Sequence, residues 1–269
     1  RQPDLRGWRP TRRLAPGLAG IIAWHLHGQF DAVESLRLRV GGLPQHPRPP
    51  LDYMLVFAVQ GLINEYVEPA VVIRDGAVRT VPSLAEVEEL EFPGVERPLE
   101  AFTTSGGVST LPQTLAGRVR NLDYKTIRYR GHCERIRLLA DLGLCDARPV
   151  SVNGAEVAPR ELLGVLLTRA LTFADEDLIL VLVEAEGERA GRRWRRTCRI
   201  LDRHDTAHGI SAMMRMTGYP AAIIAWMLAA GVITERGARP QELVVPAERL
   251  LAELGRRGVQ PAFSEAPLP

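Results

Sequence analysis

The chain has 269 residues, 46% hydrophobic and 25% charged, which is an ordinary globular balance with enough apolar material for a core. Its formal net charge of +2 argues against a general electrostatic affinity for nucleic acid. No apolar run reaches the ~20 residues of a membrane-spanning helix, and no signal-peptide pattern opens the sequence. The three cysteines show no CxxC spacing, so we expect a reducing, cytoplasmic location without a disulfide framework or a cysteine zinc site.

Helical and strand patterns mix without regular βαβ alternation. Residues 1–16, rich in Arg and Pro, predict an irregular lead-in. Helical spacing of apolar residues predicts helices at 18–28, 51–67, 133–143, 159–171, about 209–230 and about 246–257. Alternation predicts strands at 35–43, 99–105 and 121–132, and hairpins at 71–81 and 177–202. This order favours the α+β class, with a mixed, largely antiparallel sheet and helices packed on one face.

The strand NLDYKTIRYRGH, residues 121–132, carries charge on both of its faces. Alternation places Tyr124, Thr126, Arg128 and Arg130 on one face, and Asp123, Lys125, Ile127 and Tyr129 on the other. Arg128 presents a planar donor fork that suits a carboxylate, so an anionic ligand or a subunit interface would each explain it. Lys125, the only lysine in the chain, can act as an acid or base, although a salt bridge to Asp123 is the simpler interpretation.

Three other patterns have both a functional and a structural interpretation. The turn SGGVST (105–110) can hold an anion or simply begin a helix. His204 and His208 have the spacing of two zinc ligands, but the surrounding sequence is more typical of a strand-to-helix junction. The Arg-rich strand 191–200 could stack a nucleobase, yet pairing with Glu184, Glu186 and Glu188 across a hairpin is favoured. The nucleotide motifs GxGxxG and GxxxxGK[ST] are absent.

Six segments together resemble the saccharopine dehydrogenase family, closest to its lysine 6-dehydrogenase branch. The matching segments are LAPGLAG (14–20), VGGLP (40–44), GLINEYVEP (61–69), LEAFTTSGGVSTLP (99–112), LDYKTIRYRGH (122–132) and MMRMTGYPAAIIAWMLAAGVI (213–233). They follow the family's order and cover nearly the whole chain. The fourth followed by the fifth is the most specific part of the resemblance.

The resemblance implies half of an NAD(P)-dependent oxidoreductase that acts on the C–N bond of lysine or a lysine-derived amino acid. Residues 17–235 would form a substrate-binding and homodimerisation domain of the glyceraldehyde-3-phosphate dehydrogenase C-terminal type. Residues 236–269 would pack back on a Rossmann domain. Arg128 would anchor the substrate carboxylate, and Lys125 and His132 would be candidates for proton transfer. The other implied substrate-binding residues are Tyr124, Thr103, Thr104, Ser105, Ser109 and Thr110.

The sequence departs from the family pattern in three places. The Rossmann domain that precedes this region in the family is not in the sequence, so a cofactor-binding site is not expected here. Residues 9–13 read RPTRR where the family has a small pair, and Arg130 stands where the family has Pro, adding a charge beside the predicted anchor. The chain would therefore be a domain of a longer enzyme, one subunit of a split enzyme with a separate Rossmann partner, or a cofactor-independent enzyme or ligand-binding protein that reuses the fold.

Overall fold

The computed structural model describes residues 14–15 and 17–269. The predicted lead-in, apart from Leu14 and Ala15, and the segment RPTRR at 9–13 lie outside the described residues. Within the described part of the chain, no helix is long and apolar enough to cross a membrane.

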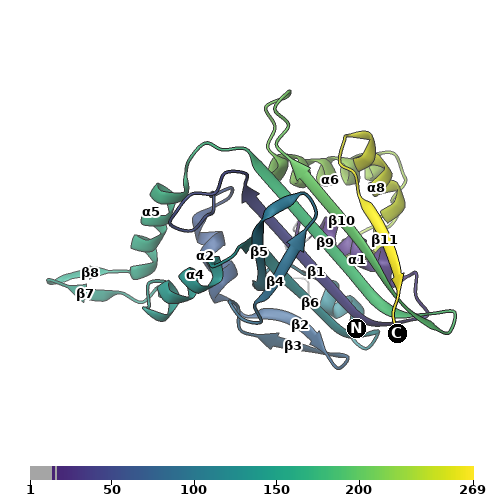
Figure 1. The fold of residues 1–269 in the computed structure, drawn as a ribbon, viewed down its shortest axis with the longest axis horizontal. Coiled ribbons are helices and arrows are strands. Elements are labelled where there is room, and N and C mark those ends of the chain that lie inside the picture. Colours follow the sequence, from purple (N-terminus) through teal and green to yellow (C-terminus); the bar gives the residue numbers. More distant parts are fainter. Residues whose placement is uncertain (1–13, 16) are drawn as a thin grey trace.

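One large sheet forms the centre of the molecule (Figure 1). Its backbone order is β11-β10-β9-β1-β6-β2-β3, and the β4–β5 hairpin joins it where β5 pairs with β6. The β1–β6 pair is parallel and the other described pairs are antiparallel, which confirms the predicted mixed, largely antiparallel α+β fold. The strands are β1 Ala32–Pro44, β2 Ala70–Arg74, β3 Ala77–Val81, β4 Glu88–Phe92, β5 Val95–Thr103, β6 Val119–Tyr129, β7 Val150–Val152, β8 Ala155–Val157, β9 Asp177–Arg189, β10 Arg192–Arg203 and β11 Ala262–Pro267.

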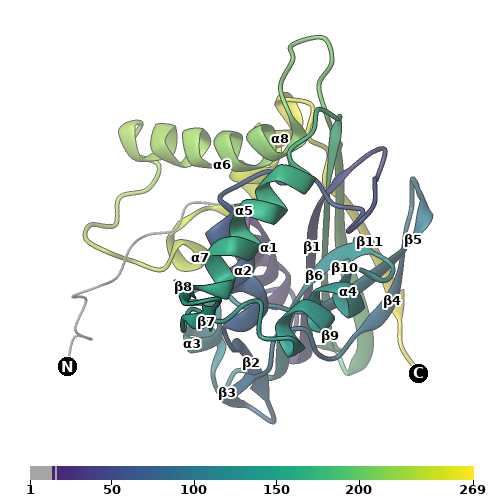
Figure 2. The ribbon, with the colours of Figure 1, turned by 90° about the vertical axis from the view of Figure 1, so that its left-hand side faces the viewer.

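The helices gather on one side of this sheet and leave the β4–β5 hairpin on the other, as Figure 2 shows for α2, α5 and α6. A separate β7–β8 hairpin projects from the body beside α5 (Figure 1). The helices are α1 Leu18–His27, α2 Val59–Val67, α3 Leu111–Leu115, α4 His132–Asp141, α5 Pro159–Leu171, α6 Ala212–Ala229, α7 Gln241–Val244 and α8 Ala247–Arg256.

Two apolar clusters share the helix-covered face of the sheet. The first packs α1, α3, α6 and α8 against β1, β6 and β9. The second packs α2, α4 and α5 around Phe102 of β5. Phe102 lies opposite Thr126, which alternation places on the same face as Tyr124 of the first cluster. A third cluster, which includes Ile127 and Tyr129, fills the opposite face.

The predicted helix at 51–67 is wrong in its first half, because only Val59–Val67 is helical. Asp52 has a positive φ of 52°, and its backbone N–H bonds to the carbonyl of Arg48. The N–H of Leu55 donates to the carbonyl of Leu171 at the end of α5. The positive φ at Asp52 and the long-range bond of Leu55 interrupt the hydrogen-bond pattern that a helix over this segment would need.

The C-terminal segment belongs to the same core as the rest of the domain. Leu250 and Leu254 of α8 are fully buried in the first cluster, and β11 pairs with β10 along the sheet edge. The packing of residues 236–269 against a Rossmann domain therefore stays a prediction, while their packing against this domain is a structural fact.

Candidate functional site

A cavity of about 510 Å³ opens on the helix-covered face of the sheet, between α2 and the start of α6. Its volume is in the range of small-molecule sites. Its floor comes from β1 and β6, and its walls from the irregular segment before α2, from α2 itself and from the first turns of α6. The lining residues are Leu14, Ala15, Val40, Gly41, Gly42, Tyr53, Val56, Phe57, Ala58, Gly61, Glu65, Tyr124, Thr126, Arg128, Ser211, Met213, Met214 and Thr217.

Arg128 is the one cation among the described lining residues, and it is only 3% exposed. Its Nη1 donates to the carbonyl of Ile127 at 2.9 Å, and its Nε donates to the hydroxyl of Tyr66 at 3.3 Å. The guanidinium lies over the ring of Tyr53, 4.6 Å from the ring centre. Among the described residues, no carboxylate lies within 4 Å of Arg128 for an ion pair.

Arg128 stays protonated although it is buried. Burial by itself lowers the pKa of Arg128, but Tyr66, Tyr53 and Glu65 raise it, and the net direction is upward from an already high value. A buried guanidinium is costly unless an anion or several acceptors compensate it. Among the described residues, Nη2 of Arg128 has no hydrogen-bond partner, so this guanidinium can donate to an anion.

His132 is linked to Arg128 through the hydroxyl of Tyr66, which contacts both side chains. The Nε2 of His132 lies 2.9 Å from the Tyr66 hydroxyl, and its Nδ1 lies 2.9 Å from the carbonyl of Leu51. Burial, with the nearby charge of Arg128, lowers the pKa of His132 to about 3. The ring is therefore neutral near pH 7, with Nδ1–H donating to Leu51 and Nε2 accepting from Tyr66. The Tyr66 hydroxyl can then accept from Arg128 and donate to His132 at the same time.

The remaining lining is mostly apolar and aromatic, apart from one acidic residue. Glu65 of α2 carries that negative charge, and its field acts on Arg128 and on the hydroxyl of Tyr124. Burial raises the pKa of Tyr124 to about 12, so that its hydroxyl is neutral near pH 7. Val40, Val56, Phe57 and Met213 supply apolar surface.

Two glycines allow close approaches at the cavity floor. A side chain at Gly41 would meet the carbonyl oxygen of Ile127 at 2.6 Å, so only glycine lets β1 lie so near to β6 here. A side chain at Gly107 would meet the ring of Tyr124 at 2.2 Å. Gly41 in VGGLP and Gly107 in SGGVST therefore have a packing role beside β6.

The hydroxyl residues predicted to line the pocket instead make contacts around it. Of the described residues that line the cavity, none comes from 103–110. Thr103 donates to the carbonyls of Pro82 and Ala85, Ser105 donates to the carbonyl of Asn64, and Thr110 donates to Glu242. Ser109 is exposed. The hydroxyl of Thr104 is buried and has no hydrogen-bond partner among the described residues. Ligand contacts by these five residues stay predictions.

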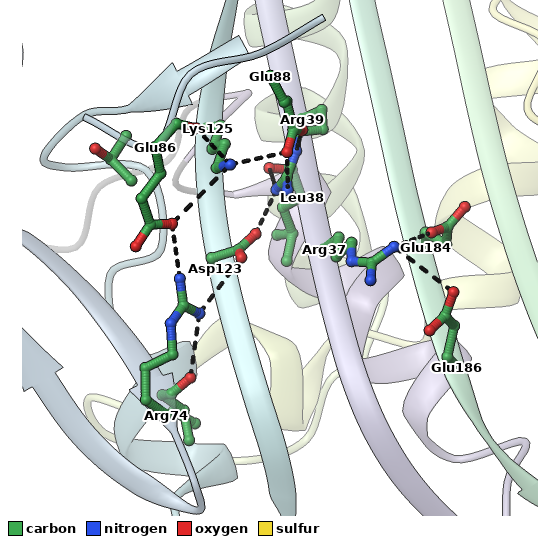
Figure 3. A network of polar contacts seen from close by, with 12 residues as sticks. Arg37, Leu38, Arg39, Arg74, Glu86, Glu88, Asp123, Lys125, Glu184 and Glu186 are labelled. Atoms are coloured by element: carbon green, nitrogen blue, oxygen red, sulfur yellow. Dashed lines mark hydrogen bonds and ion pairs between the residues drawn. The ribbon is translucent and has the colours of Figure 1, made fainter. Parts of the chain in front are cut away.

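Lys125 points away from the cavity into an ion-pair network on the opposite face of the sheet, as Figure 3 shows. Its Nζ donates to Glu88 at 2.8 Å and to the carbonyl of Glu86 at 2.6 Å. Asp123 instead pairs with Arg39 and with Arg74. The predicted pair between Lys125 and Asp123 is therefore wrong. Each has another partner, because neighbouring strands bring arginines and glutamates alongside both.

Arg130 does not place a second charge beside Arg128. β6 ends at Tyr129, and the side chain of Arg130 is 63% exposed and pairs with Glu89. Gly131 follows with a positive φ of 88° and turns the chain into α4. The expectation that Arg130 modifies the predicted anchor is thus wrong, because alternation ends with the strand.

The two other polar patterns have structural partners. Residues 204–211 form turns and an isolated bridge between Asp205 and Ile210, so His204 and His208 do not share a helix face. Within the described ranges, no three His, Cys, Asp or Glu residues group closely enough to hold a metal ion. In the Arg-rich strand, Arg195 pairs with Glu184 and Glu186. This confirms the predicted hairpin pairing at that position.

Sequence reasoning missed most of the cavity wall. Tyr53 and Phe57 fall in the segment wrongly predicted as helix, and Glu65 lies in α2 without a charge pattern that marks it. Tyr66, which contacts Arg128, was missed for the same reason. The resemblance segment GLINEYVEP contains both Glu65 and Tyr66, and it is the signal that could have drawn attention to them.

Residues 14–259 match the family described as Saccharopine dehydrogenase C-terminal domain. Among solved structures, apo histidine-tagged saccharopine dehydrogenase (L-Glu forming) from Saccharomyces cerevisiae is similar, with a TM-score of 0.74 and 18% sequence identity. That match covers 93% of this chain and 72% of the yeast chain. At this identity the likeness shows a shared fold.

Proposed function

The chain belongs to the saccharopine dehydrogenase C-terminal domain family, and from this premise we propose that it is the amino-acid-binding half of an oxidoreductase that acts on the C–N bond of lysine or a lysine-derived amino acid. The resemblance to the lysine 6-dehydrogenase branch supports the lysine-type substrate. The protein's task on this proposal is to bind and orient the amino acid, so that the carbon bearing the nitrogen faces the redox partner.

The observation that carries this proposal is the buried guanidinium of Arg128 at the cavity wall. Arg128 makes no ion pair with a described carboxylate, so a substrate carboxylate would add the ion pair that its polar contacts do not supply. Tyr66 and Tyr53 hold the guanidinium in one orientation, so the carboxylate meets a rigid donor. Rigid placement lowers the entropy lost when a ligand binds.

The residues of this chain do not fit a dinucleotide. The sequence contains no GxGxxG turn, and the cavity floor consists of β1 and β6, without a glycine-rich turn that leads into a helix N-terminus. NAD or NADP, which the family uses, would need a Rossmann domain in the same polypeptide or in a separate subunit. We include that partner, a homodimer and a cytoplasmic location in the proposal.

The proton-transfer candidates differ in their relation to the cavity. His132 is neutral and contacts Tyr66, so we assign it a positioning role toward Arg128. Lys125 lies on the other face of β6, and its role in catalysis stays a prediction with no support from its location.

The test is the binding of L-lysine to the purified chain by isothermal titration calorimetry. We expect Arg128→Ala to abolish binding while thermal unfolding remains cooperative. Arg130→Ala, two residues away and exposed, is the matched control and should bind like the unmodified chain. Equal binding by Arg128→Ala and the unmodified chain would refute the anchor and the proposed function with it.

A further inference from the structure

We infer that Glu100 of β5 is a positioning residue for the proposed carboxylate site, where it acts on Arg128 through His132. This inference rests on the proposed function, because it takes Arg128 as the residue that binds a substrate carboxylate. It follows from the groups that the carboxylate of Glu100 contacts, and from the neighbouring cation with which it does not pair.

Glu100 and Arg128 lie directly opposite each other on neighbouring antiparallel strands, and both are buried. Residues in this register share a face of the sheet, with Cβ atoms about 5 Å apart, so an acid and an arginine placed in this way can pair. These two described side chains make no ion pair, because the Glu100 carboxylate is bonded to other groups. The orientation of Glu100 is therefore set by those groups.

Backbone N–H groups at the start of α4 hold the carboxylate of Glu100. The N–H of Gly131 donates to Oε2 at 2.9 Å, and the N–H of Cys133 donates to Oε1 at 2.7 Å. Gly131 is the N-cap residue and has no side chain to cap the helix, so Glu100 satisfies these donors in its place. This pair of hydrogen bonds, the Glu100 clamp, ties the first turn of α4 to β5.

His132 lies between the two residues of the clamp, so the clamp fixes the backbone from which its ring projects. The ring is held by the carbonyl of Leu51 at Nδ1 and by the hydroxyl of Tyr66 at Nε2, each at 2.9 Å. The same hydroxyl accepts from Nε of Arg128 at 3.3 Å. A displacement of His132 would therefore reach Arg128 through one shared hydroxyl group.

The charge of Glu100 and its clamp predict opposite effects on a ligand. A negative charge opposite Arg128 disfavours another anion there, so by its field alone a neutral residue at this position would strengthen carboxylate binding. Loss of the clamp would instead release His132 and weaken binding. Glu100→Gln distinguishes the two effects, because glutamine has the size of glutamate, no charge, and one acceptor oxygen where the clamp needs two.

Calorimetric titration of the 269-residue chain with L-lysine tests the inference. We expect Glu100→Gln to bind about tenfold more weakly than the unmodified chain, which corresponds to the loss of one charge-assisted hydrogen bond. Glu100→Asp keeps two acceptor oxygens and should lose less affinity than Glu100→Gln. The matched control is Glu89→Gln, opposite Glu100 on β4 with its side chain 74% exposed, and it should bind like the unmodified chain.

A double-mutant cycle and NMR test the route through His132. Adding His132→Asn to Glu100→Gln should weaken lysine binding no further than the larger of the two single changes, because both interrupt the same series of contacts. With 15N-labelled histidine, the ring signals of His132, identified by their loss in His132→Asn, should move away from the Nδ1–H tautomer in Glu100→Gln. The signals of the exposed His46 should stay unchanged. If Glu100→Gln does not fold, Glu100→Asp takes its place in both experiments.

The outcomes separate the inference from the function on which it rests. Equal or tighter lysine binding by Glu100→Gln, additive losses in the cycle, or unmoved His132 signals would overturn the inference. A smaller loss for Glu100→Gln than for Glu100→Asp would also overturn it, since that order indicates packing alone. In each case the proposed function stands as long as Arg128→Ala abolishes binding. If L-lysine does not bind, or Arg128→Ala binds it normally, the proposed function fails, and the NMR signals still decide whether Glu100 positions His132.

Discussion

Acid should destabilise this protein through His132, and the variant His132→Asn should remove that sensitivity. In the folded chain the pKa of His132 is about 3, against 6.5 for an unperturbed histidine, because burial and the charge of Arg128 disfavour the imidazolium. Between these two values the unfolded chain binds a proton at this position and the folded chain does not. The folded state therefore loses stability as the pH falls below about 6.5 and keeps it above.

The size of the effect follows from the two pKa values. Protonation of His132 in the unfolded chain lowers the free energy of unfolding by about 2 kcal/mol at pH 5 relative to pH 8. Each pH unit below 6.5 contributes up to about 1.4 kcal/mol to this loss. Asparagine cannot titrate in this range, yet its amide can still donate toward the carbonyl of Leu51. Both proteins keep their other titrating groups, so the difference between them isolates His132.

Urea unfolding at pH 8 and pH 5, followed by circular dichroism, measures the effect. The loss of unfolding free energy between the two pH values should be about 2 kcal/mol smaller in His132→Asn than in the unmodified chain. The control is His46→Asn, on a surface loop with the side chain 78% exposed, where surface substitutions usually change stability by less than about 0.5 kcal/mol. Equal losses in His132→Asn and the unmodified chain would show that His132 is not held neutral by burial.

Two further predictions concern the sheet. Arg39 and Lys125 together hold the pKa of Glu88 low, although burial raises it, and Lys125→Met removes one of these two cations. We expect the free energy of unfolding, measured in urea, to fall by about 1–3 kcal/mol. Unchanged stability would show that the network contributes little. Gly107→Ala forces a methyl group against the ring of Tyr124, so thermal unfolding should show a loss of about 1–3 kcal/mol or more. Its matched control is Gly218→Ala in α6, where the new methyl group has open space around it. This control should be neutral or stabilise the protein by up to about 1 kcal/mol. Equal effects of the two changes would contradict the packing argument.

Much of the fold could be predicted from the sequence because most elements carry a strong local pattern. The hairpin at 177–202 and the helix at 159–171 agree with β9, β10 and α5 to within a residue or two. The segment 51–58 could not be predicted, since its conformation depends on a positive φ at Asp52 and on the bond from Leu55 to Leu171, a residue distant in the chain. β11 was missed because all its residues are exposed, so no apolar alternation marks it.

The candidate site was predictable only where the strand pattern of β6 extended to it. Alternation correctly separated Arg128 and Tyr124 from Lys125 and Asp123, because side chains of a strand point to opposite faces whatever their neighbours are. Alternation says nothing about which loops and helices cover each face. The strand pattern therefore could not predict the side-chain partner of Arg128, because Tyr66 belongs to α2.

The charge on both faces of β6 follows from two different tasks. Arg39, Asp123 and Lys125 make ion pairs among strands on the face away from the helices, where the network ties β1, β6 and the segment around Glu88 together. Arg128 faces the cavity and makes no such pair with a described residue, so its cation is available to a ligand.

This division explains why lysine could not replace Arg128. The guanidinium donates from Nε to Tyr66 and from Nη1 to the carbonyl of Ile127, and its plane lies over Tyr53. Those three contacts fix the direction in which Nη2 points. A lysine ammonium is a compact charge on a flexible stem and cannot satisfy both acceptors and still present a donor in one direction. The planar, forked shape of arginine is thus as necessary to this site as its charge.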